Sequence, residues 1–155
     1  MEPEGKGNSV TEGKGMMEIV NSHEAVHVRN SDLAQSSFSD AKLSLSSFDD
    51  VNMQGSTFTN INLGDASFMD GNLSNVSIKN ANLTGMKIND AKAPLSSFDD
   101  VNMQGSTFTN INLGNASFID VDLSNVSIRD ANLTGMKIND VLVSDLIRVY
   151  EKHSK

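Results

Sequence analysis

Apolar residues recur at every fifth position over most of this chain. A small or apolar residue, or a serine, stands two places before most of them. The remaining places are largely polar, so one five-residue rule describes the whole segment. The apolar series consists of Val28, Leu33, Phe38, Leu43, Phe48, Met53, Phe58, Leu63, Phe68, Leu73, Ile78, Leu83, Ile88, Ala93, Phe98, Met103, Phe108, Leu113, Phe118, Leu123, Ile128, Leu133, Ile138 and Val143.

A period of five fits neither a helix nor a continuous strand. Five helical residues advance by about 500°, and an odd step along a strand reverses the face. The chain must therefore turn a corner in every unit, with the apolar pair pointing inward and two residues forming the bend. Residue types that tolerate turn conformations mark the second bend position: Gly55, Gly85, Gly105, Gly135, Asp50, Asp70, Asp90, Asn60 and Asn110.

The alternation of Phe with Leu or Met predicts four sides per coil. In a four-sided coil, Phe lies over Phe and Leu over Leu in successive coils. In a three-sided coil, Phe would lie over Leu. One interior column should hold Phe38, Phe58, Ile78, Phe98, Phe118 and Ile138, and the opposite column Phe48, Phe68, Ile88, Phe108 and Ile128. On the outside we expect stacked hydroxyls along the Phe sides and stacked amides along the Leu sides, from Asn52, Asn62, Asn72, Asn82, Asn102, Asn112 and Asn132.

The repeat is itself duplicated. Residues 45–64 and 95–114 are identical, and residues 45–90 differ from 95–140 only at positions 65, 69, 71, 72, 79 and 80 of the first copy. The copies, 45–94 and 95–144, are offset by two and a half coils, so the second is the first rotated by half a turn. A natural duplication and an engineered lengthening both fit this arrangement.

Several units resemble those of the pentapeptide repeat proteins. The sequence ANLTG occurs at residues 81–85 and 131–135, with SDLAQ at 31–35 and INLGN at 111–115. The resemblance covers roughly residues 26–145 and implies an all-β fold, a right-handed four-sided parallel β-helix. It also implies a class of partner, since some family members resemble duplex DNA in shape and charge and bind type II topoisomerases such as DNA gyrase.

Both ends of the rod need a cover, because terminal coils expose apolar residues and strand edges. We expect residues 1–15 to form a disordered tail or an added leader, residues 16–25 an N-terminal cap, residues 26–143 the β-helix, and residues 144–155 a short helix and tail. Ser144 is the expected N-cap with Asp145 in the first turn. Such a helix should dock on its own last coil or on a second subunit, giving a homodimer, through Leu146, Ile147, Val149 and Tyr150.

Composition narrows the functions to consider. The 155 residues suffice for one domain, and the formal charge of -8 argues against nucleic-acid binding. The chain has no cysteine, and neither a signal peptide nor a membrane-spanning run is evident. We expect a soluble cytoplasmic protein. The weakest interior point is Ala93, where a cavity is expected beside Pro94.

Candidate chemistry is sparse. HEAVH at residues 23–27 matches a zinc-protease motif, but that motif needs a helix. The inward register of Val26 and Val28 predicts a strand, in which His23 and His27 would lie about 13 Å apart. We therefore expect no metal, no cofactor and no catalytic residues.

Acidic bend residues form the candidate interaction site. The four-sided model places Asp50, Asp70, Asp90 and Asp130 along one edge and Asp40, Asp100, Asp120 and Asp140 along the opposite edge, with Asp49 and Asp99 beside them. The leading interpretation is a non-enzymatic structural or protein-binding scaffold. The alternative, carried by the resemblance, is a DNA-mimicking modulator of type II topoisomerase.

Overall fold

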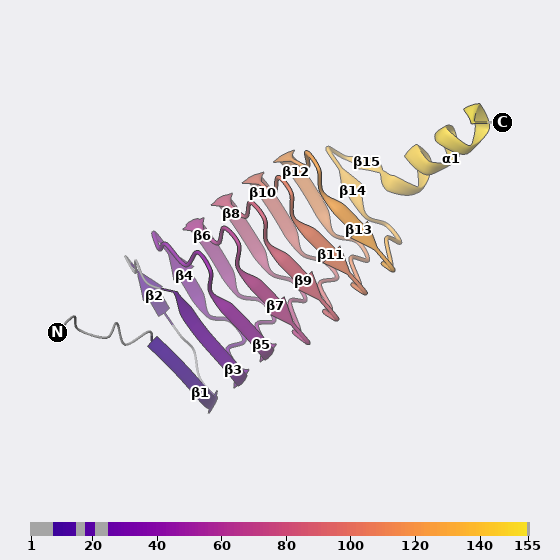
Figure 1. Cartoon of the computed structure of the whole chain (residues 1–155). Coiled ribbons are helices and arrows are strands. Elements are labelled where there is room, and N and C mark those ends of the chain that lie inside the picture. Colours follow the sequence, from indigo (N-terminus) through magenta and orange to yellow (C-terminus); the bar gives the residue numbers. More distant parts are fainter. Residues whose placement is uncertain (1–7, 15–17, 21–24, 155) are drawn as a thin grey trace.

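The chain forms a right-handed four-sided parallel β-helix with one helix at its C-terminal end (Figure 1). A computed structural model describes residues 8–14, 18–20 and 25–154. In this part of the chain, sheet A contains β1 (Asn8–Lys14), β3 (Val26–Asp32), β5 (Ser47–Asn52), β7 (Ser67–Met69), β9 (Lys87–Asn89), β11 (Thr107–Thr109) and β13 (Ser127–Arg129). Sheet B contains β2 (Glu18–Val20), β4 (Ser37–Ser39), β6 (Thr57–Asn62), β8 (Ser77–Asn82), β10 (Ser97–Asn102), β12 (Ser117–Asp122), β14 (Lys137–Ile138) and β15 (Val141–Leu142). The predicted fold class is confirmed.

Each residue in a wall lies over the residue twenty positions away. In sheet B, Phe38 pairs with Phe58 and Phe98 with Phe118, and each pair of rings stacks with centroids 4.6 Å apart. In sheet A, Phe48 stacks on Phe68 at the same separation. Both predicted Phe and Ile columns are therefore confirmed, and nearly all of their members in the central coils are fully buried.

The corners explain why Asn, Asp and Gly recur every fifth residue. Every fifth residue from Asn30 to Asp140 has a positive φ, between 47° and 71°. This left-handed conformation costs little for Gly and is tolerated by Asn and Asp. Gln35, Leu45 and Leu95 break the rule. The two leucines have φ values of 62° and 61° and exposed fractions of 67% and 61%.

Replacing both corner leucines by asparagine is expected to stabilise the protein. A side chain such as leucine loses roughly 1–2 kcal/mol in the left-handed region, and neither side chain is buried in return. We expect each of Leu45→Asn and Leu95→Asn to add about 1 kcal/mol to the free energy of unfolding in urea. The control is Leu43→Asn, which buries an amide in the core and should destabilise. Equal or lower stability of the corner variants would contradict this account.

Buried serines fill inward positions at which the repeat has no apolar residue. Ser56, Ser96 and Ser106 occupy inward positions, and their hydroxyls donate to carbonyls of the preceding coil at 2.6–2.9 Å. The Ser96 hydroxyl also accepts from the Val76 N–H at 3.3 Å. Each hydroxyl thus joins two coils, which satisfies buried polar groups. The sequence pattern treated these serines only as small fillers.

A small apolar cavity lies at the junction of the two copies, as the sequence predicted for Ala93. Its volume is about 10 Å³, room for roughly one methyl-sized group. The residues lining it are Phe58, Phe68, Leu73, Val76, Ile78, Met86, Ile88, Ala93, Ser96 and Phe98.

Filling this cavity is expected to raise the melting temperature. Ala93 shares its column with Leu73 and Leu113, which shows that the column accepts leucine. Ala93→Leu should stabilise by about 1 kcal/mol, since the void is small and part of the new side chain must displace its neighbours. Ala91→Leu is the matched control, because Ala91 is also buried but does not line this interior cavity. It should destabilise by about 1–3 kcal/mol. An unchanged or lower melting temperature for Ala93→Leu would argue against the cavity as a weak point.

The N-terminal segment differs from the expected disordered tail. Asn8–Lys14 form β1, which pairs in parallel with β3, and Glu18–Val20 form β2, which pairs in parallel with β4. Residues 1–7, 15–17 and 21–24 lie outside the described residues. Backbone hydrogen bonding at an open sheet edge needs no particular side chains, so a glycine-rich segment can supply strands. The cap expected in residues 16–25 includes β2.

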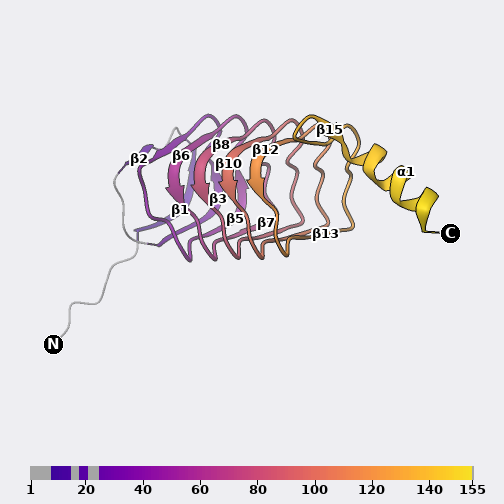
Figure 2. The same ribbon diagram turned by 90° about the horizontal axis from the view of Figure 1, so that it is seen from above.

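The C-terminal end also departs from the sequence pattern. A two-residue turn at Asn139 and Asp140, both with positive φ, reverses the chain so that β15 runs antiparallel to β14. Consecutive positive φ values suit a tight hairpin. Val141, which stands two places before Val143 of the apolar series, is 46% exposed. The helix α1 (Val143–His153) begins directly after Leu142, so the predicted Ser144 N-cap is wrong, while Asp145 does lie in the first turn. Figures 1 and 2 show α1 extending away from the stack of coils.

Candidate interaction surface

The structure gathers the predicted acidic residues along two diagonally opposite edges. The first acidic edge contains Asp50, Asp70, Asp90 and Asp130 together with Asn30 and Asn110, all at corner positions twenty residues apart. Corner N–H groups hold this edge in register, as when the Asp90 N–H donates to the Thr109 carbonyl at 3.1 Å. The Asn110 side-chain N–H donates to Asp90 Oδ1 at 2.6 Å. The carboxylates are therefore aligned, but asparagines interrupt them.

The second acidic edge contains Asp40, Asp100, Asp120 and Asp140, with Asn60 and Asn80 between the first two. The Asn60 amide donates to Asp40 at 3.1 Å, and the Asn80 amide donates to Asn60 at 3.2 Å. The negative charge on this edge is thus concentrated towards the C-terminal end.

The other two edges carry little charge. The third edge holds Gln35, Gly55, Asn75, Leu95, Asn115 and Gly135. The fourth edge holds Leu45, Asp65, Gly85, Gly105 and Asn125.

The acidic residues expected beside the edges lie on the flat walls. Asp49 projects from sheet A, and Asp99 projects from sheet B. A salt bridge of 3.1 Å joins Asp99 to Lys79 of the preceding coil. Because that pair is exposed, it contributes little to stability, but it neutralises Asp99 as part of an acidic surface.

A shallow groove runs along the first acidic edge. Its volume is about 400 Å³, and a lysine lines it together with two aspartates. The lining residues are Asp90, Ala91, Lys92, Asn110, Ile111, Asn112, Asp130 and Asn132. The mixed charges make it a polar surface feature of the edge.

Stacked amides follow the Leu walls, as predicted. The Asn72 amide donates to Asn52 at 3.1 Å, and the Asn132 amide donates to Asn112 at 3.2 Å. The predicted hydroxyl ladder is weaker, since the hydroxyl oxygens of Thr57 and Ser37 lie 3.5 Å apart. Hydrogen bonds from the Ser124 hydroxyl and backbone N–H lower the pKa of Asp122 at the end of one Leu wall.

The described histidines form no metal site. His23 and Glu24 of the HEAVH motif lie outside the described residues, whereas Val26 and His27 lie in strand β3. Among the described residues, no group of three or more histidine and carboxylate side chains could hold a metal ion.

One contact that sequence reasoning missed joins His27 Nδ1 to Ser47 Oγ at 2.9 Å. Residues twenty positions apart stack, so the four-sided period was the signal for it. A catalytic serine also needs a carboxylate that orients the imidazole and an oxyanion site. In the described part of the chain, Ser47 is the hydrogen-bond partner of His27, which is exposed on the flat outer face of sheet A.

Apolar residues are left uncovered at the C-terminal end. Leu123, Val126, Ile128, Leu133 and Ile138 are only partly buried. Their counterparts fifty residues earlier are buried, at 0–7% exposed: Leu73, Val76, Ile78, Leu83 and Ile88. The last coil lacks a neighbour on one side, so its interior faces solvent.

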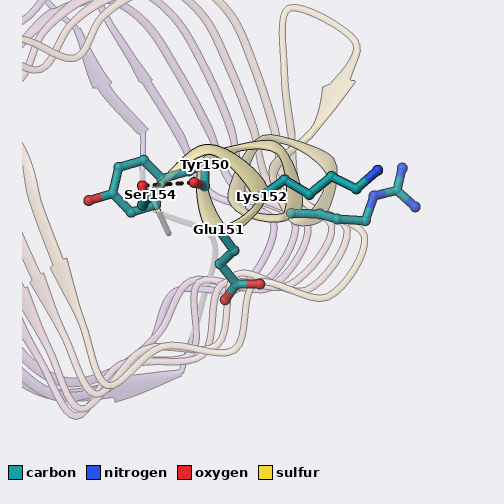
Figure 3. Close-up of a pocket in the computed structure, with 5 residues that line it drawn as sticks. Tyr150, Glu151, Lys152 and Ser154 are labelled. Carbon is teal, nitrogen blue, oxygen red and sulfur yellow. Dashed lines mark hydrogen bonds between the residues drawn. The ribbon is translucent and has the colours of Figure 1, made fainter.

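The predicted contact residues of α1 are also exposed. The exposed fractions are 48% for Leu146, 47% for Ile147, 54% for Val149 and 73% for Tyr150, and no residue of α1 is buried. Of the two expected docking modes, the helix does not use its own last coil. Figure 3 shows Tyr150 and Lys152 pointing to opposite sides of α1. The hollow of about 650 Å³ shown there is lined by side chains of α1 and the following Ser154 only, so it is the outer surface of this helix.

Stacked coils of twenty residues, built from five-residue units with a left-handed corner, define a solenoid repeat protein. Residues 23–98 match a family model described as a pentapeptide repeat region, and residues 96–135 match one described as pentapeptide repeats. The chain belongs to the pentapeptide repeat family.

Solved structures of other family members are similar over most of this chain. Rfr23 from the cyanobacterium Cyanothece 51142 is 18% identical, with 84% of this chain and 88% of that chain covered and a TM-score of 0.32. HetL from Nostoc sp. strain PCC 7120, involved in regulating heterocyst differentiation, is 12% identical, with 86% and 90% covered and a TM-score of 0.28. A trypsin-treated variant of QnrB1, a plasmid-mediated fluoroquinolone resistance protein, is 12% identical, with 94% and 97% covered and a TM-score of 0.29. No curated protein sequence matches this chain.

No helix in the described residues is long and apolar enough to cross a membrane.

Proposed function

We propose that this chain is a non-enzymatic protein-binding scaffold that acts as a homodimer joined at its C-terminal ends. The observation that carries the proposal is the uncovered apolar end, formed by the last coil and by α1. An isolated helix of eleven residues is marginal in water, so α1 needs a packing partner. A second copy supplies the same apolar end, and a two-fold axis buries both ends at once.

The oligomeric state tests this proposal. Light scattering after size exclusion should give twice the chain mass of 16.7 kDa. Leu146→Asp combined with Tyr150→Asp should give monomers with an unchanged β-sheet circular dichroism spectrum, because both side chains are exposed in one copy. Lys152→Asp is the control on the opposite side of α1 and should remain dimeric. A monomeric parent protein at high concentration would refute the proposal.

A second function is favoured by a different observation, the two acidic edges on opposite corners. Rows of carboxylates at about 4.8 Å spacing on a narrow rod resemble a nucleic-acid backbone in charge. A protein of this kind would occupy the DNA-binding channel of a type II topoisomerase.

A supercoiling assay with DNA gyrase tests the second function. The chain should inhibit supercoiling, and Asp100→Asn, Asp120→Asn and Asp140→Asn together should reduce the inhibition, since asparagine already occupies this edge at Asn60 and Asn80. The control removes as much charge elsewhere, with Asp32→Asn, Asp65→Asn and Asp145→Asn. Absence of an effect of the parent protein at large excess would exclude this function.

A further inference from the structure

One Leu wall of the rod, the wall that contains Ala93, is interrupted where the two copies join. In its other coils a side-chain oxygen accepts from the backbone N–H two residues later. The acceptor and donor pairs, at 2.9–3.3 Å, are Asp32 and Ala34, Asn52 and Gln54, Asn72 and Ser74, Asn112 and Gly114, and Asn132 and Thr134. At the junction these positions hold Lys92, which has no side-chain oxygen, and Pro94, which has no N–H. This coil therefore lacks the bond that fixes the wall elsewhere.

The side-chain bonds between coils stop at the same place. In this wall the Asn72 amide donates to Asn52, and beyond the junction the Asn132 amide donates to Asn112. Lys92 stands between Asn72 and Asn112 in the column, and its ammonium cannot accept from an amide. The amide ladder is thus divided into two parts.

The interior is discontinuous at this level as well. The small apolar cavity borders Ala93. Ile78 and Ile88 lie between phenylalanines in the two neighbouring walls and interrupt both columns of stacked rings. The corner residue Leu95 has a φ of 61°, a conformation that is costly for leucine.

The chain contains a matched segment that lacks these defects. Residues 40–45 (DAKLSL) and 90–95 (DAKAPL) differ only in having Leu-Ser or Ala-Pro at their fourth and fifth positions. Residues 45–64 and 95–114, which follow, are identical. Leu43 fills the interior at the position that Ala93 occupies in the second segment, and it is fully buried.

The backbone hydrogen bonds of the two segments correspond. The donors and acceptors are the Leu43 N–H and Asn62 carbonyl at 2.7 Å, the Ala93 N–H and Asn112 carbonyl at 2.8 Å, the Leu45 N–H and Gly64 carbonyl at 3.0 Å, and the Leu95 N–H and Gly114 carbonyl at 2.9 Å. A difference in local stability between the segments must therefore come from their side chains.

We propose that residues 91–95 form a seam in the rod, a wall segment that opens locally while the other coils stay folded. Opening breaks the backbone bonds of Ala93 and Leu95, but it exposes less apolar surface than opening a wall anchored by leucine. Pro94 stiffens the open segment and so opposes opening. This effect is smaller than the loss of a buried leucine side chain, so the seam is the weakest wall segment of the interior coils.

Hydrogen exchange of the native protein, measured residue by residue by NMR, tests the seam. Protection factors at Ala93 and Leu95 should be about tenfold lower than at Leu43 and Leu45, although the latter pair lies nearer the N-terminal end of the rod. Low concentrations of urea should hardly change exchange at Ala93, because a local opening exposes little surface. Equal protection in the two segments would overturn the proposal, as would a urea dependence at Ala93 equal to that of global unfolding.

Two double variants exchange the residues that differ. Ala93→Leu with Pro94→Ser gives residues 90–95 the sequence of residues 40–45, and it should raise the protection of Leu95 about tenfold and leave that of Leu45 unchanged. Leu43→Ala with Ser44→Pro is the reverse exchange and should lower the protection of Leu45. If the reverse variant does not fold, the first variant decides alone, and an unchanged protection factor at Leu95 would refute the seam.

Discussion

Phe48→Ala is expected to lower the free energy of unfolding by about 3–5 kcal/mol. The Phe48 ring is fully buried and stacks on Phe68 with centroids 4.6 Å apart and an interplanar angle of 13°. Its other neighbour in the column is Val28. The walls are rigid hydrogen-bonded coils, so they cannot collapse into the space that the ring leaves, and the cavity cost adds to the lost burial.

Urea unfolding followed by circular dichroism measures this effect. Met69→Ala is the matched control, because Met69 lies in the next strand of the same sheet but is 45% exposed on the outer face. Its replacement should change stability by no more than about 0.5 kcal/mol. Similar losses for the two variants would show that the stacked interior column does not dominate stability.

Deleting residues 45–94 is expected to leave a folded, shorter rod. The join places Leu95 at the corner that Leu45 occupied and Phe98 at the position that Phe48 occupied. Every later side chain therefore keeps the inward or outward direction that it has in the parent protein. Phe98 moves from sheet B to sheet A, and the terminal hairpin and α1 emerge from the opposite wall. Stability should fall because repeat proteins lose interface energy with each coil removed.

The control deletion removes residues 45–92, two fewer. It should nonetheless melt at a lower temperature, because two extra residues at the join force Phe98 out of its inward position or require an irregular corner. Circular dichroism and thermal melting compare the two proteins. An insoluble or molten product from the longer deletion would contradict the half-turn relation between the copies.

Much of the rod was predictable from the sequence because its information is local and periodic. Phe and Leu alternate in units of five, so only a four-sided coil stacks like residues, and the structure stacks Phe38 on Phe58 and Phe48 on Phe68. Asn, Asp and Gly mark corners because they tolerate positive φ. The acidic edges follow from the same geometry, whereas their role as an interaction site stays a prediction.

The ends were not predictable, because there the same residues have different neighbours. The sequence MKIND occurs at residues 86–90 and again at residues 136–140. In the first copy Asn89 lies in strand β9 and the coil continues, whereas in the second copy Asn139 has a positive φ and the chain turns back. The pentad pattern continued to Val143 and therefore gave no sign of the hairpin.

The sequence by itself determined the pitch, the four walls and the corners of this protein, since each unit carries its own inward pair and bend. Only the tertiary structure decided how the rod ends, with β1 and β2 added at one end and β13 left open beside α1 at the other. A terminal strand has hydrogen-bonding groups on one side without a neighbour. What satisfies them depends on the chain segments and partners within reach, and a repeating pattern carries no information about these.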